Sequence, residues 1–252
     1  MKTALITGAT SGIGNEFARQ LADRGYRLIV TGRRQDRLEQ LKSELSVPVD
    51  IYVYDLNKKK ECYELLETLQ DETIDVFINN AGFGLAGSFL ETDVKREVSM
   101  IKVNDVAMHI LFKGILQMMQ QDGGGHILNV GSSAGLLPAG PYMATYYASK
   151  AYVVSLTRAV DCELKEKKSN VRVSVLCPGP VNTEFNDVAD VVFSLKGISP
   201  RQCVKEALKG MDRKKVVIVP SIRMKLATIF SHIVPYPILI KITARQQKKK
   251  LG

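Results

Sequence analysis

Short runs of β-branched and apolar residues alternate with longer amphipathic segments along most of this 252-residue chain. Such alternation is typical of β-α-β units, in which successive strands run parallel and helices cover the sheet. The predicted strands span residues 4–7, 27–31, 49–54, 74–79, 126–131, 171–176 and 216–219. The predicted helices include residues 15–24, 35–45, 58–69, 106–120 and 145–165. The sequence therefore predicts an α/β fold, a doubly wound parallel seven-stranded sheet with helices on both faces.

No repeat, low-complexity stretch or proline-rich linker divides the chain. Its apolar fraction of 45% is enough to bury the core of one large α/β domain. We predict one domain over residues 1–220. Residues 221–252 are predicted to form a C-terminal extension that is basic, partly apolar and not an independent domain.

A glycine-rich loop joins the first predicted strand to the first predicted helix. This order suits a dinucleotide, whose pyrophosphate binds free N–H groups at the positive end of the helix. Gly8 allows the chain to turn, Gly12 allows the backbone to approach the phosphates, and Gly14 allows tight helix packing. The predicted contacts are Gly8, Thr10, Ser11, Gly12, Ile13 and Gly14.

Tyr146 and Lys150 lie four residues apart in a predicted helix, so their side chains share one face. A free tyrosine has a pKa near ~10, and a neighbouring ammonium would lower that pKa toward the neutral range, where proton transfer is efficient. Ser133 lies thirteen residues before Tyr146, just after a predicted strand. The spacing of the tyrosine and the lysine alone is also compatible with an ordinary half-buried helix face.

Taken together, these motifs resemble the short-chain dehydrogenase/reductase family over residues 1 to about 220. The matching elements are Gly8, Gly12 and Gly14, the Asn-Asn-Ala-Gly run of residues 79–82, Asn104, Ser133, Tyr146 with Lys150, and the Pro-Gly turn of residues 178–183. The resemblance implies a Rossmann fold. It also implies an enzyme that transfers a hydride between a nicotinamide cofactor and a ketone or secondary alcohol.

The resemblance also implies a role for each catalytic residue. Tyr146 would donate a proton to the carbonyl oxygen, and Ser133 would stabilise the developing alkoxide. Lys150 would also hold the nicotinamide ribose, and Asn104 would position a water that relays protons. Ser132 is the alternative serine, but Ser133 has the family's thirteen-residue offset. Further cofactor contacts implied by the family are Asp55, Leu56, Asn79, Ala81, Gly82, Tyr146, Lys150, Pro178, Gly179, Val181 and Thr183.

The charge after the second predicted strand favours NADP(H). In dinucleotide folds an acidic residue about 20 positions beyond the glycines binds the NAD ribose, whereas an arginine accommodates the NADP phosphate. Arg33 and Arg34 occupy this place, with no carboxylate beside them in the sequence. A guanidinium binds phosphate through two parallel hydrogen bonds. The alternative is that both arginines simply begin an exposed helix.

Apolar residues after the fourth and fifth predicted strands favour a lipophilic substrate, such as a steroid ketone or a 3-oxoacyl compound. They are Phe83, Leu85, Leu136, Leu137, Tyr142 and Met143. Residues 187–197 are typical of a flap, with Phe185, Val188, Val191, Val192 and Phe193 as its apolar side chains. Simple loop packing is equally compatible with these residues. The alternative function is a non-catalytic NADP-binding regulator or membrane-peripheral protein of the same fold.

The net charge of +9 comes from the end of the chain. Residues 213–252 contain ten Lys or Arg residues and no Asp or Glu. Residues 226–240 are uncharged but too short to span a bilayer, and Pro235 and Pro237 would break a helix there. Three interpretations stay open: packing on the domain or another subunit, peripheral contact with anionic lipid, or attraction of an anionic substrate such as a coenzyme A thioester. No nucleic-acid-binding motif is present.

The four cysteines form no C-x-x-C pair, and the three histidines are isolated, so we expect reduced thiols and no metal site. The first residues lack the features of a secretory signal, which favours a cytoplasmic location. The family resemblance suggests a homodimer or homotetramer packed through residues 106–120 and 145–165.

Overall fold

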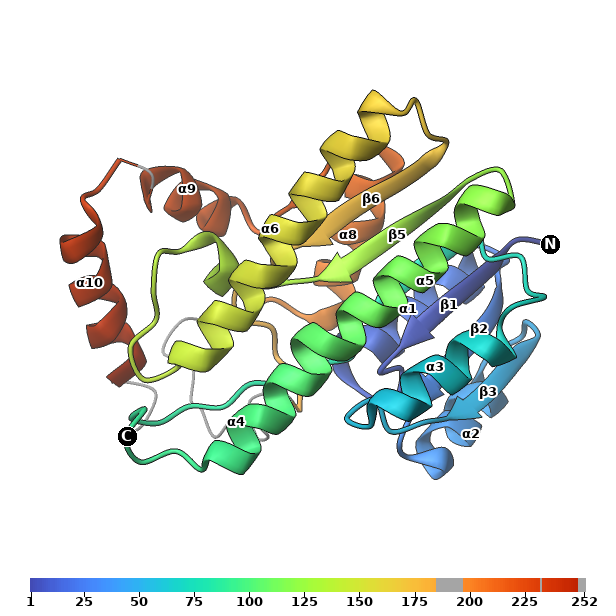
Figure 1. Cartoon of the computed structure of the whole chain (residues 1–252), viewed down its shortest axis with the longest axis horizontal. Coiled ribbons are helices and arrows are strands. Elements are labelled where there is room, and N and C mark those ends of the chain that lie inside the picture. The colour runs from blue at the N-terminus through green and yellow to red at the C-terminus, as the bar shows by residue number, and fades with distance from the viewer. Residues whose placement is uncertain (185–196, 232, 249–252) are drawn as a thin grey trace.

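Seven parallel strands form one sheet in the order β3-β2-β1-β4-β5-β6-β7 (Figure 1). The computed structural model describes residues 1–184, 197–231 and 233–248. The strands are β1 (Thr3–Thr7), β2 (Arg27–Gly32), β3 (Val49–Val53), β4 (Val76–Asn79), β5 (Gly125–Val130), β6 (Val171–Leu176) and β7 (Val217–Ile218). The strand order reverses between β1 and β4, and ligands bind outside the carboxyl ends of strands at such a point. The predicted fold class is confirmed.

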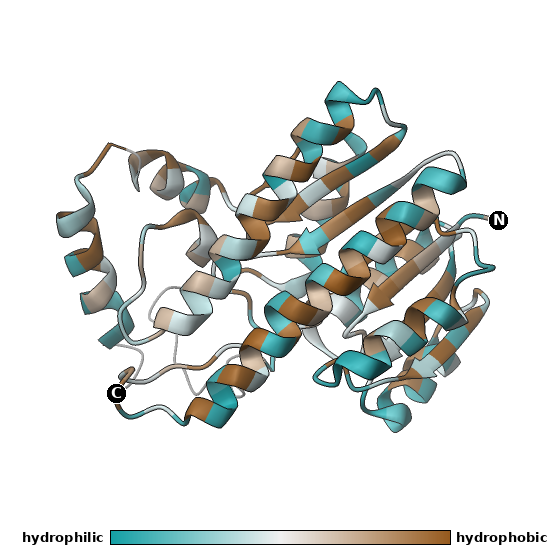
Figure 2. Ribbon diagram, viewed as in Figure 1, coloured by the Kyte–Doolittle hydropathy of each residue, from teal (hydrophilic) through white to brown (hydrophobic). Residues whose placement is uncertain are grey.

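Helices cover both faces of the sheet because its strands are apolar on both sides (Figures 1 and 2). One face carries α1 (Gly12–Asp23), α2 (Gln35–Glu44) and α8 (Pro200–Asp212), and the other carries α3 (Lys59–Thr68), α5 (Met108–Gln121) and α6 (Ala144–Glu166). Neighbouring residues of β1 pack on opposite faces of the sheet. Ile6 belongs to the hydrophobic cluster that contains Phe17 of α1, and Leu5 belongs to the cluster that contains Leu111 of α5.

The helix that leads into α5 begins earlier than the sequence predicts. It starts with α4 (Val94–Ile101), where the Asp93 carboxylate caps the helix by accepting a hydrogen bond from the Lys95 N–H. A π-helical turn, η1 (Lys102–Ala107), joins α4 to α5. Val94, Val98 and Ile101 repeat at helical spacing, so the sequence does carry the signal for this helix, which the prediction missed.

The C-terminal extension forms two helices, α9 (Ile222–Ser231) and α10 (Tyr236–Lys248). Pro235 precedes α10 and Pro237 lies in its first turn, where a missing N–H costs no helical hydrogen bond. The extension contacts the main domain through Gln247, whose amide donates a hydrogen bond to the Tyr147 hydroxyl at 2.6 Å. The domain boundary at residue 220 stays a prediction.

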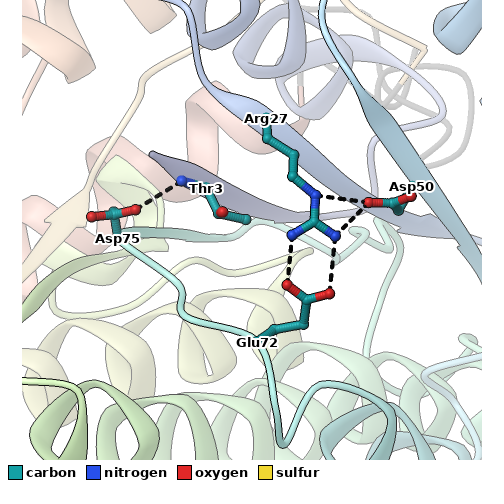
Figure 3. Close-up of polar contacts among 5 residues, drawn as sticks. All are labelled: Thr3, Arg27, Asp50, Glu72 and Asp75. Carbon is teal, nitrogen blue, oxygen red and sulfur yellow. Dashed lines mark hydrogen bonds and ion pairs between the residues drawn. The ribbon is translucent and has the colours of Figure 1, made fainter. Parts of the chain in front are cut away.

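Arg27 binds together three segments at the amino ends of the strands (Figure 3). Its guanidinium donates two hydrogen bonds to Glu72, at 2.6 and 2.9 Å, and two more to Asp50 of β3. Beside it, Asp75 accepts a hydrogen bond from the Thr3 N–H at 2.8 Å. These contacts fix the starts of β1, β2 and β3 against the loop before β4, at the edge opposite the carboxyl ends of the strands.

We expect Arg27→Met to lower the free energy of unfolding at neutral pH by about 1–2 kcal/mol, because the network is only partly exposed. The Arg27 hydrogen bond lowers the pKa of Glu72. A lowered carboxyl pKa stabilises the fold above the unfolded-state pKa near ~4.3, and this contribution is lost as the pH falls through the folded-state value. Urea unfolding of both proteins should therefore show a difference that shrinks below about pH 4.

Arg24→Met is the matched control, because it breaks an exposed ion pair with Asp212. It should change the free energy of unfolding by less than about 0.5 kcal/mol. Equal losses in the two variants would contradict a specific role for the Arg27 network.

Candidate active site

A cavity of about 600 Å³ extends from the glycine loop to α6 at the carboxyl edge of the sheet. It brings together most of the residues that the sequence predicts for the site. They are Gly8, Thr10, Ser11, Gly12, Ile13, Arg33, Arg34, Asp55, Leu56, Ala81, Gly82, Ser133, Tyr146, Lys150, Pro178, Gly179, Val181 and Thr183. Three predicted residues, Gly14, Asn79 and Asn104, do not line the cavity. Contact between the lining residues and a cofactor stays a prediction.

The glycine loop has the geometry that a dinucleotide pyrophosphate requires. Gly8 and Gly12 adopt φ angles of +67° and +54°, which disfavour any other residue. A Cβ atom on Gly14 would lie 2.2 Å from the Gly8 carbonyl oxygen, so this glycine allows helix α1 to pack on the loop. Ser11 makes no side-chain capping hydrogen bond to the first turn of α1. The loop therefore fits the phosphates of a nicotinamide dinucleotide.

Asn79 was predicted to contact the cofactor, but its side chain points into the protein. Its amide donates hydrogen bonds to the Met108 carbonyl at 3.0 Å and to Asn129 of β5 at 3.1 Å. The next residue, Asn80, lines the cavity instead and donates to the carbonyl oxygens of Thr7 and Gly8. The side chain of Asn80 thus takes the place at the cavity that the sequence predicts for Asn79, because successive side chains of an extended chain point to opposite sides.

Arg33 and Arg34 are both exposed and both line the cavity. Arg34 donates to the Thr10 hydroxyl at 3.1 Å and pairs with Glu184 at 3.2 Å. Arg37 pairs with the same carboxylate at 3.5 Å. A carboxylate therefore does lie beside the arginines, but it comes from 150 residues further along the chain, where local sequence could not reveal it. The Glu184 carboxylate partly offsets the positive charge that Arg34 offers to a phosphate.

Tyr146 and Lys150 share a face of α6, as their spacing predicts. The Lys150 ammonium lies 5.9 Å from the centre of the Tyr146 ring and donates a hydrogen bond to the Val130 carbonyl at 3.0 Å. Both residues are less than 10% exposed. The α6 helix thus holds a phenol and an amine together at the end of β5.

The expected lowering of the Tyr146 pKa is not found in the chain alone. Burial raises the pKa of Tyr146 to about 12, although a hydrogen bond with Ser132 acts in the opposite direction. Burial also lowers the pKa of Lys150 to about 8, opposed by the charge of Asp105. The expectation neglected desolvation, which disfavours both the phenolate and the ammonium. Tyr146 is consequently held in its protonated form, which suits a proton donor.

Ser132, the alternative serine, lies in contact with Tyr146. Ser132 ends the β5 segment in extended backbone and forms a side-chain hydrogen bond with Tyr146. Its oxygen also accepts a hydrogen bond from the Ala134 N–H at 3.1 Å. Ser133 lines the same cavity, and its backbone N–H donates to the Pro178 carbonyl at 2.8 Å. The structure therefore favours the alternative serine. The thirteen-residue spacing between serine and tyrosine identifies the right serine only when the loop before α6 has the family's usual length.

Asn104 lies in the π-helical turn between α4 and α5, and its side chain is 1% exposed. Its amide donates to the Phe83 carbonyl at 2.9 Å and to the Ser149 hydroxyl at 3.1 Å, and its oxygen accepts from the Phe83 N–H at 3.0 Å. All these partners belong to the loop after β4 or to α6. The Asn104 side chain thus positions the loop next to Lys150, and the proposed water relay stays a prediction.

The rest of the cavity lining combines predicted and unpredicted residues. Phe83, Leu137 and Met143 line it as expected, whereas Leu85, Leu136 and Tyr142 do not. Most of the expected flap, with Phe185, Val188, Val191, Val192 and Phe193, lies outside the described residues. Other lining residues were not anticipated: Tyr147, Met224, Gln246 and Gln247.

Tyr147 lines the cavity together with Tyr146, which it follows directly in α6. Its ring packs edge-on against Tyr146, with 6.4 Å between the centroids, and its hydroxyl accepts a hydrogen bond from Gln247. The Gln247 side-chain oxygen is buried and has no hydrogen-bond partner among the described residues. No sequence motif marks Gln247, since only the folded C-terminal extension brings it to the cavity.

Comparison with known proteins identifies the family. A family model described as short chain dehydrogenase matches residues 2–191. The chain belongs to the short-chain dehydrogenase/reductase family. It is therefore an oxidoreductase of the type that acts on alcohol and carbonyl groups, as the motifs predict.

Individual relatives share both sequence and fold. The NADP-dependent 3-hydroxy acid dehydrogenase of Escherichia coli is 36% identical over 192 residues, which cover 73% of this chain and 75% of that protein. A short-chain dehydrogenase from Sphingobium yanoikuyae, solved with NADPH, is 29% identical with a TM-score of 0.83, covering 92% of this chain and 94% of the other. A short-chain dehydrogenase/reductase from Burkholderia phymatum, solved with NAD, has the same fold at 24% identity and a TM-score of 0.84, covering 92% and 93%.

Among the described residues, no cysteine or histidine lines the cavity. Burial raises the pKa values of Cys62, Cys177 and Cys203, so these thiols stay protonated. Within the described ranges, no cluster of His, Cys, Asp and Glu side chains could hold a metal ion.

The two serines can be separated by substitution. We expect Ser132→Ala to lower kcat about 10²–10³-fold, because it removes a hydrogen-bond donor beside the reacting oxygen. Ser133→Ala should lower kcat by less than about tenfold. Initial rates of NADPH oxidation with any ketone that the unmodified protein reduces would measure both effects. The reverse order of losses would restore Ser133 to the catalytic role.

Proposed function

We propose that this protein is an NADP(H)-dependent reductase of lipophilic ketones, or the corresponding alcohol dehydrogenase. The observation that carries the proposal is the arrangement of Ser132, Tyr146 and Lys150 in one cavity with the glycine loop. The apolar side chains of Phe83, Leu137, Met143 and Met224 at the same cavity support a lipophilic substrate.

The residues of the cavity divide the chemistry between them. The bound nicotinamide supplies the hydride in reduction and accepts it in oxidation. Tyr146 donates its proton to the carbonyl oxygen, and Ser132 donates a hydrogen bond that stabilises the developing negative charge. Lys150 provides positive charge next to Tyr146 and favours the phenolate that remains after proton transfer. In the dehydrogenase direction, the same phenolate accepts the proton of the alcohol.

Tyr146→Phe tests this function directly. The substitution removes the proton donor but keeps the ring, so kcat should fall at least about 10²–10⁴-fold while NADPH still binds. Turnover is measured by NADPH oxidation in a screen of ketosteroids, 3-oxoacyl thioesters and aromatic ketones, and binding by NADPH fluorescence. Substantial turnover in the variant would contradict the role of Tyr146 as the proton donor. Absence of turnover by the unmodified protein on every ketone would favour a non-catalytic nucleotide-binding role.

We also propose NADP(H) as the cofactor, because Arg33 and Arg34 lie at the cavity where the adenosine ribose would bind. The E. coli relative named NADP-dependent and the NADPH-bound relative support this choice. Arg34 is held by its ion pair with Glu184. Arg33 forms no ion pair with another described residue, so its guanidinium is the one more available to bind the 2′-phosphate.

Replacing both arginines by alanine should weaken NADPH binding about a hundredfold, because two charge-assisted contacts to the 2′-phosphate are lost. NADH lacks this phosphate, so its dissociation constant should change by less than about threefold. Fluorescence titration with each nucleotide measures both values. Glu184→Gln is the informative companion: by freeing Arg34, it should strengthen NADPH binding and leave NADH binding unchanged. Equal losses for the two nucleotides in the alanine variant would contradict the NADP(H) assignment.

A homodimer or homotetramer packed through residues 106–120 and 145–165 stays part of the proposal. Exposed apolar side chains in these ranges support it, because Val106 and Tyr152 are 39% and 41% exposed. Such a surface is suited to packing against a second subunit.

A further inference from the structure

Helix α9 exposes its large apolar side chains and buries small polar ones. Ile222, Leu226, Ile229 and Phe230, with Ile233 just beyond the helix, are 60–75% exposed. Their spacing places them along one helical face. Thr228 and Ser231, on the side that packs inward, are 8% and 3% exposed. This burial is the reverse of what an ordinary surface helix shows.

Two more large apolar side chains are exposed at the start of α10. Tyr236 and Ile238 are 62% and 53% exposed, whereas Leu239 of the same helix is buried. We call Ile222, Leu226, Ile229, Phe230, Ile233, Tyr236 and Ile238 the tail face. In Figure 1, α9 and α10 lie at the left of the molecule, apart from the helices that cover the sheet. Figure 2 shows apolar residues on both helices. An exposed apolar surface of this kind marks an interaction site.

Positive charge accompanies the tail face. Arg223, Lys241, Arg245 and Lys248 are exposed on α9 and α10. Residues 213–252 contain no acidic residue that could neutralise them locally. None of the four forms an ion pair with another described residue, although the Lys248 ammonium lies 5.4 Å from the centre of the Tyr142 ring. The partner of this surface should therefore be apolar and negatively charged.

We propose that the tail face docks on a bilayer surface that contains anionic phospholipid. Apolar side chains on one helix face with cations around them match the acyl boundary and the headgroups of such a surface. Among the described residues, no helix is long and apolar enough to cross a membrane, so the contact is with the surface. A second copy of the chain fits less well, because two such faces would bring like charges together.

Docking would bring the active-site cavity close to the lipid. Met224 of α9 and Gln246 and Gln247 of α10 line that cavity, while their neighbours in the same helices form the tail face. The two helices thus separate the cavity from the docked surface by their own thickness.

Vesicle co-sedimentation of the full chain tests the proposal without reference to turnover. We expect binding to vesicles of phosphatidylcholine mixed with phosphatidylglycerol to be at least about tenfold tighter than to phosphatidylcholine alone at low salt. High salt should weaken the tighter binding. Leu226→Ser with Phe230→Ser should weaken it at least about tenfold, since two apolar side chains no longer enter the interface. Arg223→Gln with Lys241→Gln should weaken it about fivefold for each charge removed.

The matched control is Val53→Ser with Tyr63→Ser, which removes two apolar side chains that are 46% and 45% exposed on β3 and α3. This variant should bind the vesicles as the unmodified protein does. NADPH fluorescence confirms that every variant is folded. Failure to bind the anionic vesicles at low salt, or equal weakening by the control, overturns the proposal. A change in oligomeric mass of the Leu226→Ser/Phe230→Ser variant, seen by sedimentation velocity without lipid, also overturns it and assigns the face to a subunit interface.

Discussion

The candidate site depends on the burial of one lysine. Placing an ammonium at 5% exposure is costly unless polar groups surround it. Lys150 meets this demand with a hydrogen bond to the Val130 carbonyl at the end of β5 and with the charge of Asp105. Beside it, Gly82 lacks a side chain whose Cβ atom would lie 2.8 Å from the Asn104 side-chain oxygen. The lysine thus fixes α6 against β5, Asn104 ties the loop after β4 to α6, and Tyr146 takes its position from the same helix.

The contacts that stabilise the sheet and the residues of the candidate site lie at opposite edges of the sheet. The Arg27 network holds the amino ends of the strands, where it meets neither the glycine loop nor α6. At the carboxyl ends, Gly8 and Gly12 adopt conformations that suit a ligand more than they stabilise the fold. This division arises because parallel strands present all their carboxyl ends together, so loops there can vary while the sheet stays intact.

Sequence predicts the parts of this protein that depend on local spacing. The strand pattern, the glycine loop and the Tyr146–Lys150 pair are all set by residues a few positions apart. The sequence is less informative where the direction of a side chain, or a contact with a residue distant in the chain, determines the site. Asn79 ends β4 and Asn80 follows it, and their side chains point to different sides. Ser132 and Ser133 differ in the direction that the chain takes at the start of the loop. Glu184 and Gln247 reach the cavity from 150 and 100 residues away from their partners, and no local pattern could reveal them. The pKa shifts of Tyr146 and Lys150 depend on burial, which spacing does not specify.

The C-terminal helices contribute both to the active-site cavity and to the exposed tail face. Gln247 is buried and bound to Tyr147, so α10 is anchored to the catalytic helix. Once anchored, α9 and α10 bury Thr228, Ser231 and Thr243, whose hydroxyls are satisfied by carbonyl oxygens of their own helices. Because these hydroxyls need no partner in the domain, small polar residues can be buried under both helices while most of the large apolar side chains of α9 stay exposed. Leaving them in water disfavours the isolated protein, since apolar area gains free energy only when it is covered. The outward face is therefore better explained by a partner than by the fold itself.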